Sequence, residues 1–136
     1  MAKVLTRDEI LAAQDIKQET VPAREWGGDV IVRSCTALEQ DAYQESMFRP
    51  ELVGKKTEVK SNYRNSKARL VVKCVIGEDG KRLFSDDDAE ALGQKNAATI
   101  LRIFRVIQRL SGMDDEAEKV LEKNSEPAQT EDSPSS

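Results

Sequence analysis

The strongest hydrophobic pattern in the chain lies between Lys95 and Leu110, where apolar residues recur at helical spacing. At 100° per residue, one half of this segment collects Ala97, Ile100, Leu101, Ile103, Phe104, Ile107 and Leu110. The opposite half collects Arg102, Arg105 and Arg109. Gly112 stands where a glycine commonly ends a helix. The pattern therefore predicts an amphipathic helix over 95–110 with one face in a core.

The first third of the chain predicts a short helix followed by a β-hairpin. Thr6 and Glu9 have the spacing of a capping box, which predicts a helix over 7–14. Residues 17–21, ended by Pro22, and the β-branched residues 30–33 are typical of strands. A wide loop around Trp26 would join the two strands.

The middle of the chain contains segments of several predicted types. Thr36 and Glu39 repeat the capping-box spacing and predict a helix over 37–48. Residues 51–61 are interpreted as a connecting loop. Residues 62–76 suit a helix, which we favour, although 70–76 are β-branched enough to form a buried strand. Ser85 is a good N-cap for a helix that begins at 86–88.

Length and composition favour one α+β domain, mainly helical, with a small N-terminal β-hairpin. The chain has 136 residues, of which 38% are hydrophobic and only 4% aromatic, so aliphatic side chains must supply most of the core. We expect the domain to span 1–123, with a short charged helix over 114–123 and an acidic, disordered tail over 124–136. No apolar run approaches the ~18 residues that a membrane span needs, so no membrane partner is expected.

The chain contains no histidine, which limits the catalytic and metal-binding sites that it can form. This absence excludes Ser-His-Asp and Cys-His catalysis and removes the commonest metal ligand. A zinc site would need both cysteines, Cys35 and Cys74, together with carboxylates, and we do not expect one. Because the N-terminus lacks the apolar region of a signal peptide, we interpret the two cysteines as free thiols that pack as small apolar groups. We therefore expect no enzyme activity, no cofactor and no metal site.

Two groups of cations and one tryptophan are the candidate contact residues. The stretch from Lys55 to Lys73 contains one acid, Glu58, among its basic residues Lys55, Lys56, Lys60, Arg64, Lys67, Arg69 and Lys73. It could hold phosphates, with Tyr63 stacking on a base, or it could be a solvated face or meet an acidic protein. The candidate partner-binding residues are Trp26, Lys55, Lys56, Lys60, Arg64, Arg102, Arg105 and Arg109.

Several segments, in order and spacing, resemble the tail assembly chaperones of long-tailed (siphovirus-type) bacteriophages. The resemblance covers about residues 1–123. Its segments are VPAREWGGDVIVRS at 21–34, TALEQDAY at 36–43, ARLV at 68–71, GKRLFSD at 80–86, LG at 92–93 and QRLSG at 108–112.

This resemblance implies a protein that accompanies the tape measure protein during tail assembly in the host cytoplasm, keeps it soluble and is absent from the finished virion. It also implies self-association, and a frameshift product whose added domain recruits the major tail protein. The family offers no catalytic residues to carry over. The alternatives are a nucleic-acid-binding regulator that uses 55–73, which we favour less, and a structural tail or head-completion protein.

Overall fold

The core of the protein lies between two helices and a three-stranded sheet. The computed structural model describes residues 2–113. Helix α3 (Ser66–Cys74) packs on helix α5 (Ala97–Leu110), and α5 also contacts strands β1 (Gln18–Ala23) and β2 (Gly28–Arg33). The largest fully buried side chains are Leu70, Ile103, Ile107, Val32, Val71, Val72, Thr99 and Cys74.

Helix α5 follows the predicted pattern closely. Ile103 and Ile107 are fully buried, whereas Ala97 is exposed and Thr99 is buried in its place. Asn96 caps the helix by accepting from the Thr99 amide at 3.1 Å, so α5 begins two residues later than predicted. At the other end, Gly112 has a φ of 74° and ends the helix as predicted.

The sheet has the order β1-β2-β5, with both pairs antiparallel. The short 3₁₀ turn η1 (Arg24–Trp26) connects β1 to β2. The prediction that Pro22 ends the first strand was wrong, because β1 continues to Ala23. Since β1 is an edge strand, the missing N–H of Pro22 need not cost a ladder hydrogen bond.

Residues 70–76 divide between the two structures that the sequence left open. Helix α3 ends at Cys74, and Val75 and Ile76 form strand β5 beside Ile31 and Val32. Both parts of the segment are buried, which explains why its hydrophobic pattern alone did not separate helix from strand.

The interpretation of residues 51–61 as a connecting loop was wrong. Helix α2 (Ala37–Glu45) ends three residues before the predicted 48, and strands β3 (Phe48–Val53) and β4 (Lys56–Ser61) then form a second hairpin. Gly54 has a φ of 64°, which suits the first position of the two-residue turn that joins them.

The remaining helices are short. Helix α1 (Arg7–Ala12) has the capping box between Thr6 and Glu9, and a second such box opens α2. The 3₁₀ turn η2 (Asp86–Asp88) begins after Ser85 and continues into α4 (Ala89–Leu92). The helix predicted over 114–123 and the tail over 124–136 lie outside the described residues.

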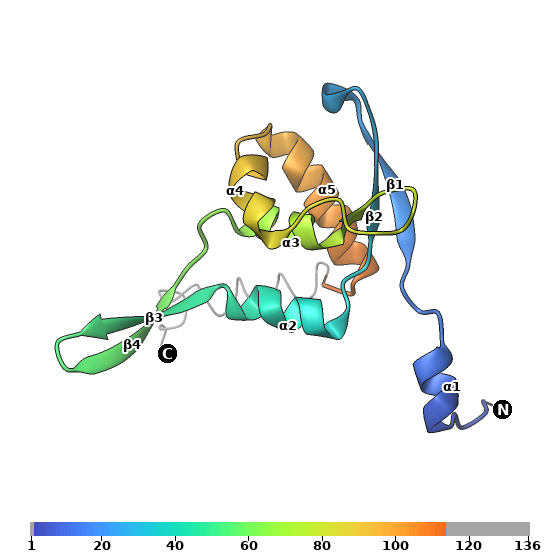
Figure 1. The fold of residues 1–136 in the computed structure, drawn as a ribbon, viewed down its shortest axis with the longest axis horizontal. Helices are drawn as coiled ribbons and strands as arrows, with labels where there is room; N and C mark the ends of the chain where they lie inside the picture. Colours follow the sequence, from blue (N-terminus) through green and yellow to red (C-terminus); the bar gives the residue numbers. More distant parts are fainter. Residues whose placement is uncertain (1, 114–136) are drawn as a thin grey trace, which may run out of the picture.

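Two elements project from this mixed α+β domain. Figure 1 shows α1 extending from the start of β1, and the β3–β4 hairpin extending from the end of α2 at the opposite end of the molecule. Neither contributes a fully buried side chain to the core. Both are therefore available for contacts beyond the chain.

Candidate partner-binding surfaces

The β3–β4 hairpin presents one apolar and one polar face. Because paired residues of an antiparallel hairpin point to the same side, its register fixes the two faces. The apolar face consists of Phe48, Pro50, Leu52, Thr57, Val59 and Ser61. All twelve strand residues are exposed, with Leu52 at 72% and Val59 at 70%. An isolated two-stranded hairpin is marginally stable in water, so this face is suited to a partner.

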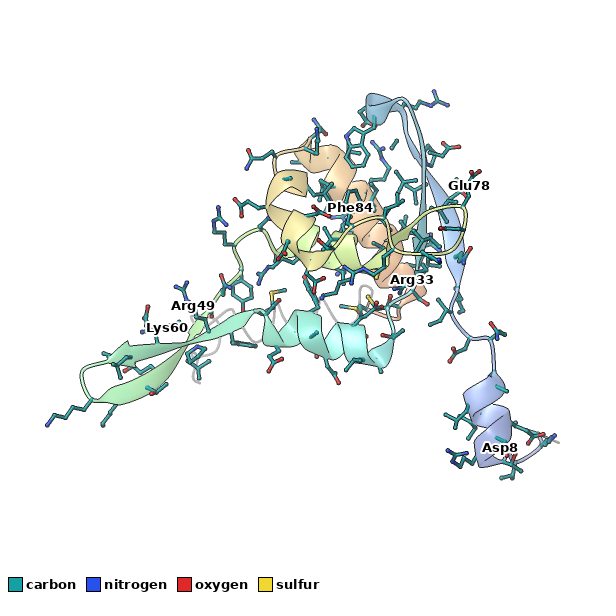
Figure 2. The ribbon with its side chains drawn as sticks, viewed as in Figure 1. Asp8, Arg33, Arg49, Lys60, Glu78 and Phe84 are labelled. Atoms are coloured by element: carbon teal, nitrogen blue, oxygen red, sulfur yellow. The ribbon has the colours of Figure 1, made fainter. Side chains whose placement is uncertain are left out.

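The polar face of the same hairpin carries the other residues of the register. Arg49 pairs across the strands with Lys60 near the base of the hairpin (Figure 2), and Glu51 pairs with Glu58. The Lys60 ammonium lies 3.0 Å from the Glu58 carboxylate. Apart from Val53, the residues of this face are charged, which distinguishes it from the apolar face.

The predicted basic stretch does not form one surface. Lys55, Lys56 and Lys60 lie on the hairpin. The Arg64 guanidinium instead pairs with Glu90 at 2.9 Å, and the Arg69 guanidinium donates to the Ser46 and Asn62 carbonyl oxygens at 2.6 Å each.

The last residues of the basic stretch also make contacts within the chain. Lys73 lies 3.3 Å from Asp86, and the Lys67 ammonium is 5.8 Å from the centroid of the Phe104 ring, within cation–π range. Of the seven predicted cations, only the three on the hairpin project with it away from the core. The seven cations of the candidate phosphate-binding stretch therefore do not lie together on one surface.

Two of the three arginines on the polar side of α5, Arg102 and Arg109, form ion pairs within the chain, and Arg105 is the third. Arg102 donates to the Glu25 carboxylate at 2.7 Å and to the Pro22 carbonyl oxygen at 3.0 Å. The hydrogen bond from Arg102 lowers the pKa of Glu25 to about 2.

Further along α5, Arg109 donates to both oxygens of Glu19, at 2.8 and 2.9 Å. Arg105 lies between these two contacts along the helix and is exposed, and no ion pair within residues 2–113 includes it. Arg102 and Arg109 therefore hold β1 against α5, and Arg105 is left for solvent or a partner.

Trp26 lies at the tip of the β1–β2 hairpin and is 38% exposed. It lines an open, mainly apolar hollow of about 410 Å³ together with Phe84, Leu92 and Lys95. One side of the indole therefore faces this chain, while the other remains accessible. This position suits a cover over the core as well as a contact with a partner.

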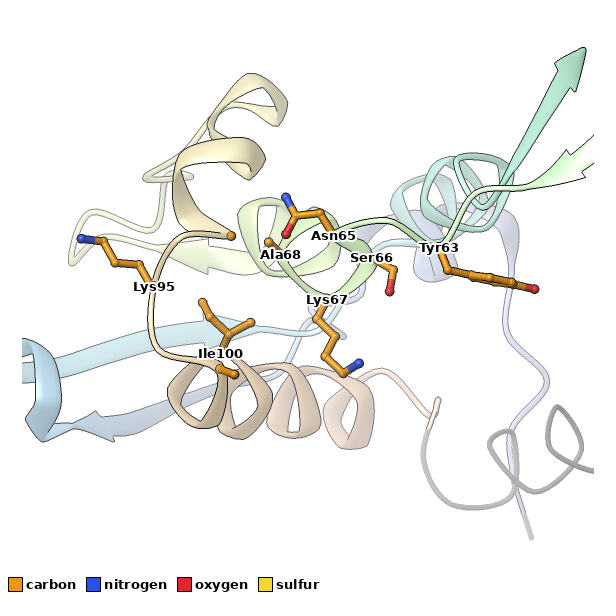
Figure 3. A pocket seen from close by; sticks show the side chains of 9 residues that line it. Tyr63, Asn65, Ser66, Lys67, Ala68, Lys95 and Ile100 are labelled. Carbon is orange, nitrogen blue, oxygen red and sulfur yellow. The ribbon is translucent and has the colours of Figure 1, made fainter.

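A second hollow, of about 240 Å³, lies between α3 and the start of α5 (Figure 3). Tyr63, Lys67, Lys95 and Ile100 contribute to its wall. Its lining mixes apolar, neutral polar and cationic side chains, and among residues 2–113 no carboxylate contributes to it. It is open to solvent, and the described residues that line it form no convergent set of catalytic groups.

The N-terminal arm is an apolar surface that the sequence analysis did not identify. Val4 is 90% exposed and Leu11 68%, and Leu5 and Ile10 are also exposed. Both this arm and the apolar face of β3–β4 were missed as candidate surfaces. For the hairpin a signal existed: Phe48, Pro50 and Leu52 alternate with the charged residues Arg49 and Glu51 and thus show the two-residue period of a strand.

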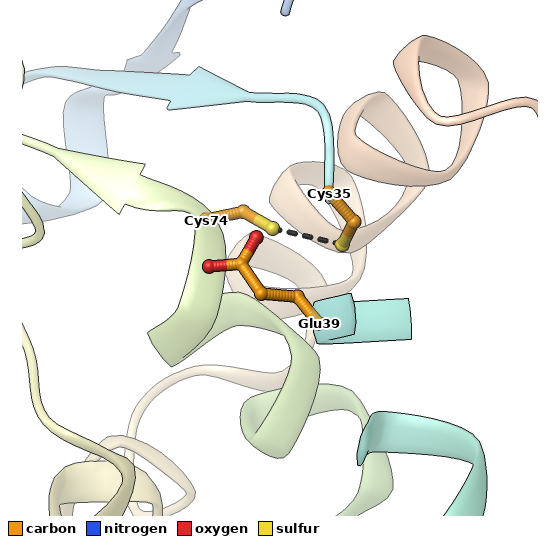
Figure 4. A group of neighbouring side chains, drawn as sticks. All are labelled: Cys35, Glu39 and Cys74. Carbon is orange, nitrogen blue, oxygen red and sulfur yellow. Dashed lines mark hydrogen bonds between the residues drawn. The ribbon is translucent and has the colours of Figure 1, made fainter. Parts of the chain in front are cut away.

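The two cysteines meet near the start of α2. The Cys35 and Cys74 sulfurs are 3.0 Å apart, with the Glu39 carboxylate beside them (Figure 4). Glu39 already accepts from Arg33 through both oxygens at 2.7 Å and from the Thr36 amide at 3.0 Å. A carboxylate so engaged is poorly placed to ligate a cation, and the adjacent guanidinium opposes one.

Among residues 2–113, no helix is both long enough and apolar enough to cross a bilayer.

Comparison with known proteins places the chain in a family. The model of the phage tail assembly chaperone family matches residues 6–123. The solved structure of the bacteriophage HK97 tail assembly chaperone is similar in fold, with a TM-score of 0.54 at 17% sequence identity, covering 79% of this chain and 95% of that one. No match was found among curated protein sequences. On the family match, which spans most of its length, this chain belongs to the phage tail assembly chaperones.

Proposed function

We propose that this chain binds the tape measure protein of its phage, keeps it soluble until the tail tube forms around it, and is absent from the finished virion. The observation that carries the proposal is the uncovered apolar face of the β3–β4 hairpin in a member of the chaperone family. A long helical protein with exposed apolar stripes aggregates unless those stripes are covered.

The geometry of the hairpin supports this use. It projects from α2, so a partner could contact Leu52 and Val59 without disturbing the core. Lys55, Lys56 and Lys60 lie on the same hairpin and would add contacts to acidic residues at the edge of the interface. Repeating such contacts in several copies along one tape measure protein would raise the overall affinity through multivalency.

Other candidate residues would contribute differently. Arg105 has no ion-pair partner within residues 2–113 and could contact a partner from α5, and the accessible part of Trp26 could do the same from the β1–β2 hairpin. Arg102 and Arg109 would act indirectly, by holding β1 in place. Arg64, which pairs with Glu90, would also act within the chain rather than on a partner.

The proposal includes self-association and a location in the host cytoplasm, where tails assemble. A form extended by a translational frameshift would recruit the major tail protein to the complex. The described residues form a mixed α+β unit, and the matched range ends at 123. We accordingly propose that 1–123 is the chaperone domain and 124–136 an acidic tail. No step of this function requires catalysis.

Co-expression with the tape measure protein of the same phage tests the proposal. We expect a soluble complex with several copies of this chain per tape measure protein, measured by size-exclusion chromatography with light scattering. A tape measure protein that precipitates equally with and without this chain would contradict it. Mass spectrometry of purified virions should detect no copies, and their presence would instead identify a structural tail protein.

A further inference from the structure

The thiols of Cys35 and Cys74 lie close enough together to react with each other. Cys35 lies between β2 and α2, and Cys74 is the last residue of α3. Their sulfurs are 3.0 Å apart, about 1 Å beyond the length of a disulfide bond. The two residues are 39 positions apart in sequence, so their contact is a product of the fold (Figure 4).

The two thiols differ in access to solvent. Cys74 is 0% exposed, whereas Cys35 is partly exposed, and the two thiols share a hydrogen bond. That contact lowers the pKa of Cys35, while contact with Cys35 and burial raise the pKa of Cys74. Because the thiolate is the nucleophile and must be reached by the oxidant, Cys35 is the residue that reacts first.

We propose that Cys35 and Cys74 form a thiol–disulfide site that low-molecular-weight disulfides such as oxidised glutathione convert to an intramolecular disulfide. The Cys35 thiolate attacks one sulfur of the small disulfide, forms a mixed disulfide and expels a small thiolate. The Cys74 sulfur then attacks the Cys35 sulfur and expels the second small thiolate, which takes up the Cys74 proton as it leaves. The cysteines lose two electrons, and the small disulfide gains them as it becomes two thiols.

The nearby polar groups favour this chemistry over metal binding. Two sulfurs alone do not complete a tetrahedral zinc site, and Glu39 is held by Arg33 and Thr36. Arg33 also adds positive charge near Cys35, which disfavours a cation. It is the hydrogen bond with Cys74, more than Arg33, that lowers the pKa of Cys35, since the negative charge of Glu39 acts in the opposite direction to Arg33. A disulfide here would link the base of α2, the helix that carries β3–β4, to α3. The site itself does not depend on the proposed function.

Oxidation of the full chain by glutathione disulfide tests the proposal. After reduction and removal of the reductant, the monomer should lose two hydrogens in intact mass, and both thiols should resist maleimide labelling. Cys74→Ser should instead accumulate a glutathione adduct on Cys35. Cys35→Ser should form no adduct under the same conditions, because Cys74 is buried.

A second measurement needs no variant. The oxidised wild-type chain should unfold at a midpoint temperature at least about 5 °C above that of the reduced chain, because the crosslink closes a long loop. Wild type that keeps both thiols, or that forms only intermolecular disulfides, would overturn the proposal. So would tight binding of Zn²⁺ by the reduced chain in equilibrium dialysis, since that would make the pair a metal site.

Discussion

Replacing two apolar residues of the β3–β4 hairpin should separate partner binding from folding. In the double variant Leu52→Ser, Val59→Ser, both changes lie on the apolar face, where the side chains are 72% and 70% exposed. Exposed substitutions usually change the free energy of unfolding by no more than about 0.5 kcal/mol each. We therefore expect the variant to fold with nearly wild-type stability.

The expected loss in binding follows from the same exposed fractions. Fully burying a Leu or Val side chain contributes about 1.5–3 kcal/mol. With some 70% of each side chain left to bury, a partner that covers both would gain roughly 1–2 kcal/mol from each. Removing both should weaken binding to the tape measure protein by roughly 30- to 1,000-fold.

The assay is a titration of the tape measure protein, or of a soluble helical fragment of it, with each variant. Glu51→Ser, Glu58→Ser is a matched control, because these residues pair directly across the strands on the polar face. We expect the control to change the dissociation constant by less than about threefold. If Leu52→Ser, Val59→Ser stays folded and binds as wild type does, the apolar face is not the contact surface.

Three further predictions concern the body of the domain. Ile103→Ala removes a fully buried side chain of α5 and should lower the free energy of unfolding by about 2–5 kcal/mol in urea titrations; a smaller loss would mean a looser core. Glu25→Gln should lower the midpoint temperature of unfolding at pH 7 and have no effect once the pH has fallen to about 2. Arg102 depresses the pKa of Glu25 in the folded state. The ion pair therefore stabilises the fold above the unfolded-state pKa of about 4.5, and this stabilisation is lost as the pH falls toward 2. An effect that is independent of pH would contradict this. Gly93→Ala should destabilise the protein by about 1–3 kcal/mol in thermal unfolding, although alanine ordinarily favours helices, because its methyl group would collide with the side chain of Asn65; a gain in stability would show that Asn65 moves aside freely.

The helix boundaries show what local sequence controls. Capping boxes at Thr6 and Thr36 and the glycine at 112 act within one turn of the chain, so their effects could be predicted from spacing alone. The apolar half of α5 could also be predicted, since a helix with a 3.6-residue period buries one side wherever it packs. The mixed α+β class and the family followed from the same local patterns and from short segments in order.

The tertiary structure decided which charged and apolar groups remain available. Arg102 and Arg109 repeat on one face like Arg105, but only the fold brings Glu25 and Glu19 to the first two. The basic stretch appeared continuous because sequence order does not show that Arg64 and Lys73 meet Glu90 and Asp86. Ion pairs between distant residues depend on how elements pack, and no periodicity encodes them.

The same reason explains the hairpin and the thiol pair. The two-residue period of β3 was present in the sequence, but the exposure of its apolar face depends on α2 carrying it away from the core. Cys35 and Cys74 could be interpreted as free thiols from the sequence, yet their contact exists only because the end of α3 packs beside the start of α2. Sequence by itself determined the local elements and their buried sides, because those depend on neighbours along the chain. Only the fold decided which surfaces stay open, because that depends on residues far apart in sequence.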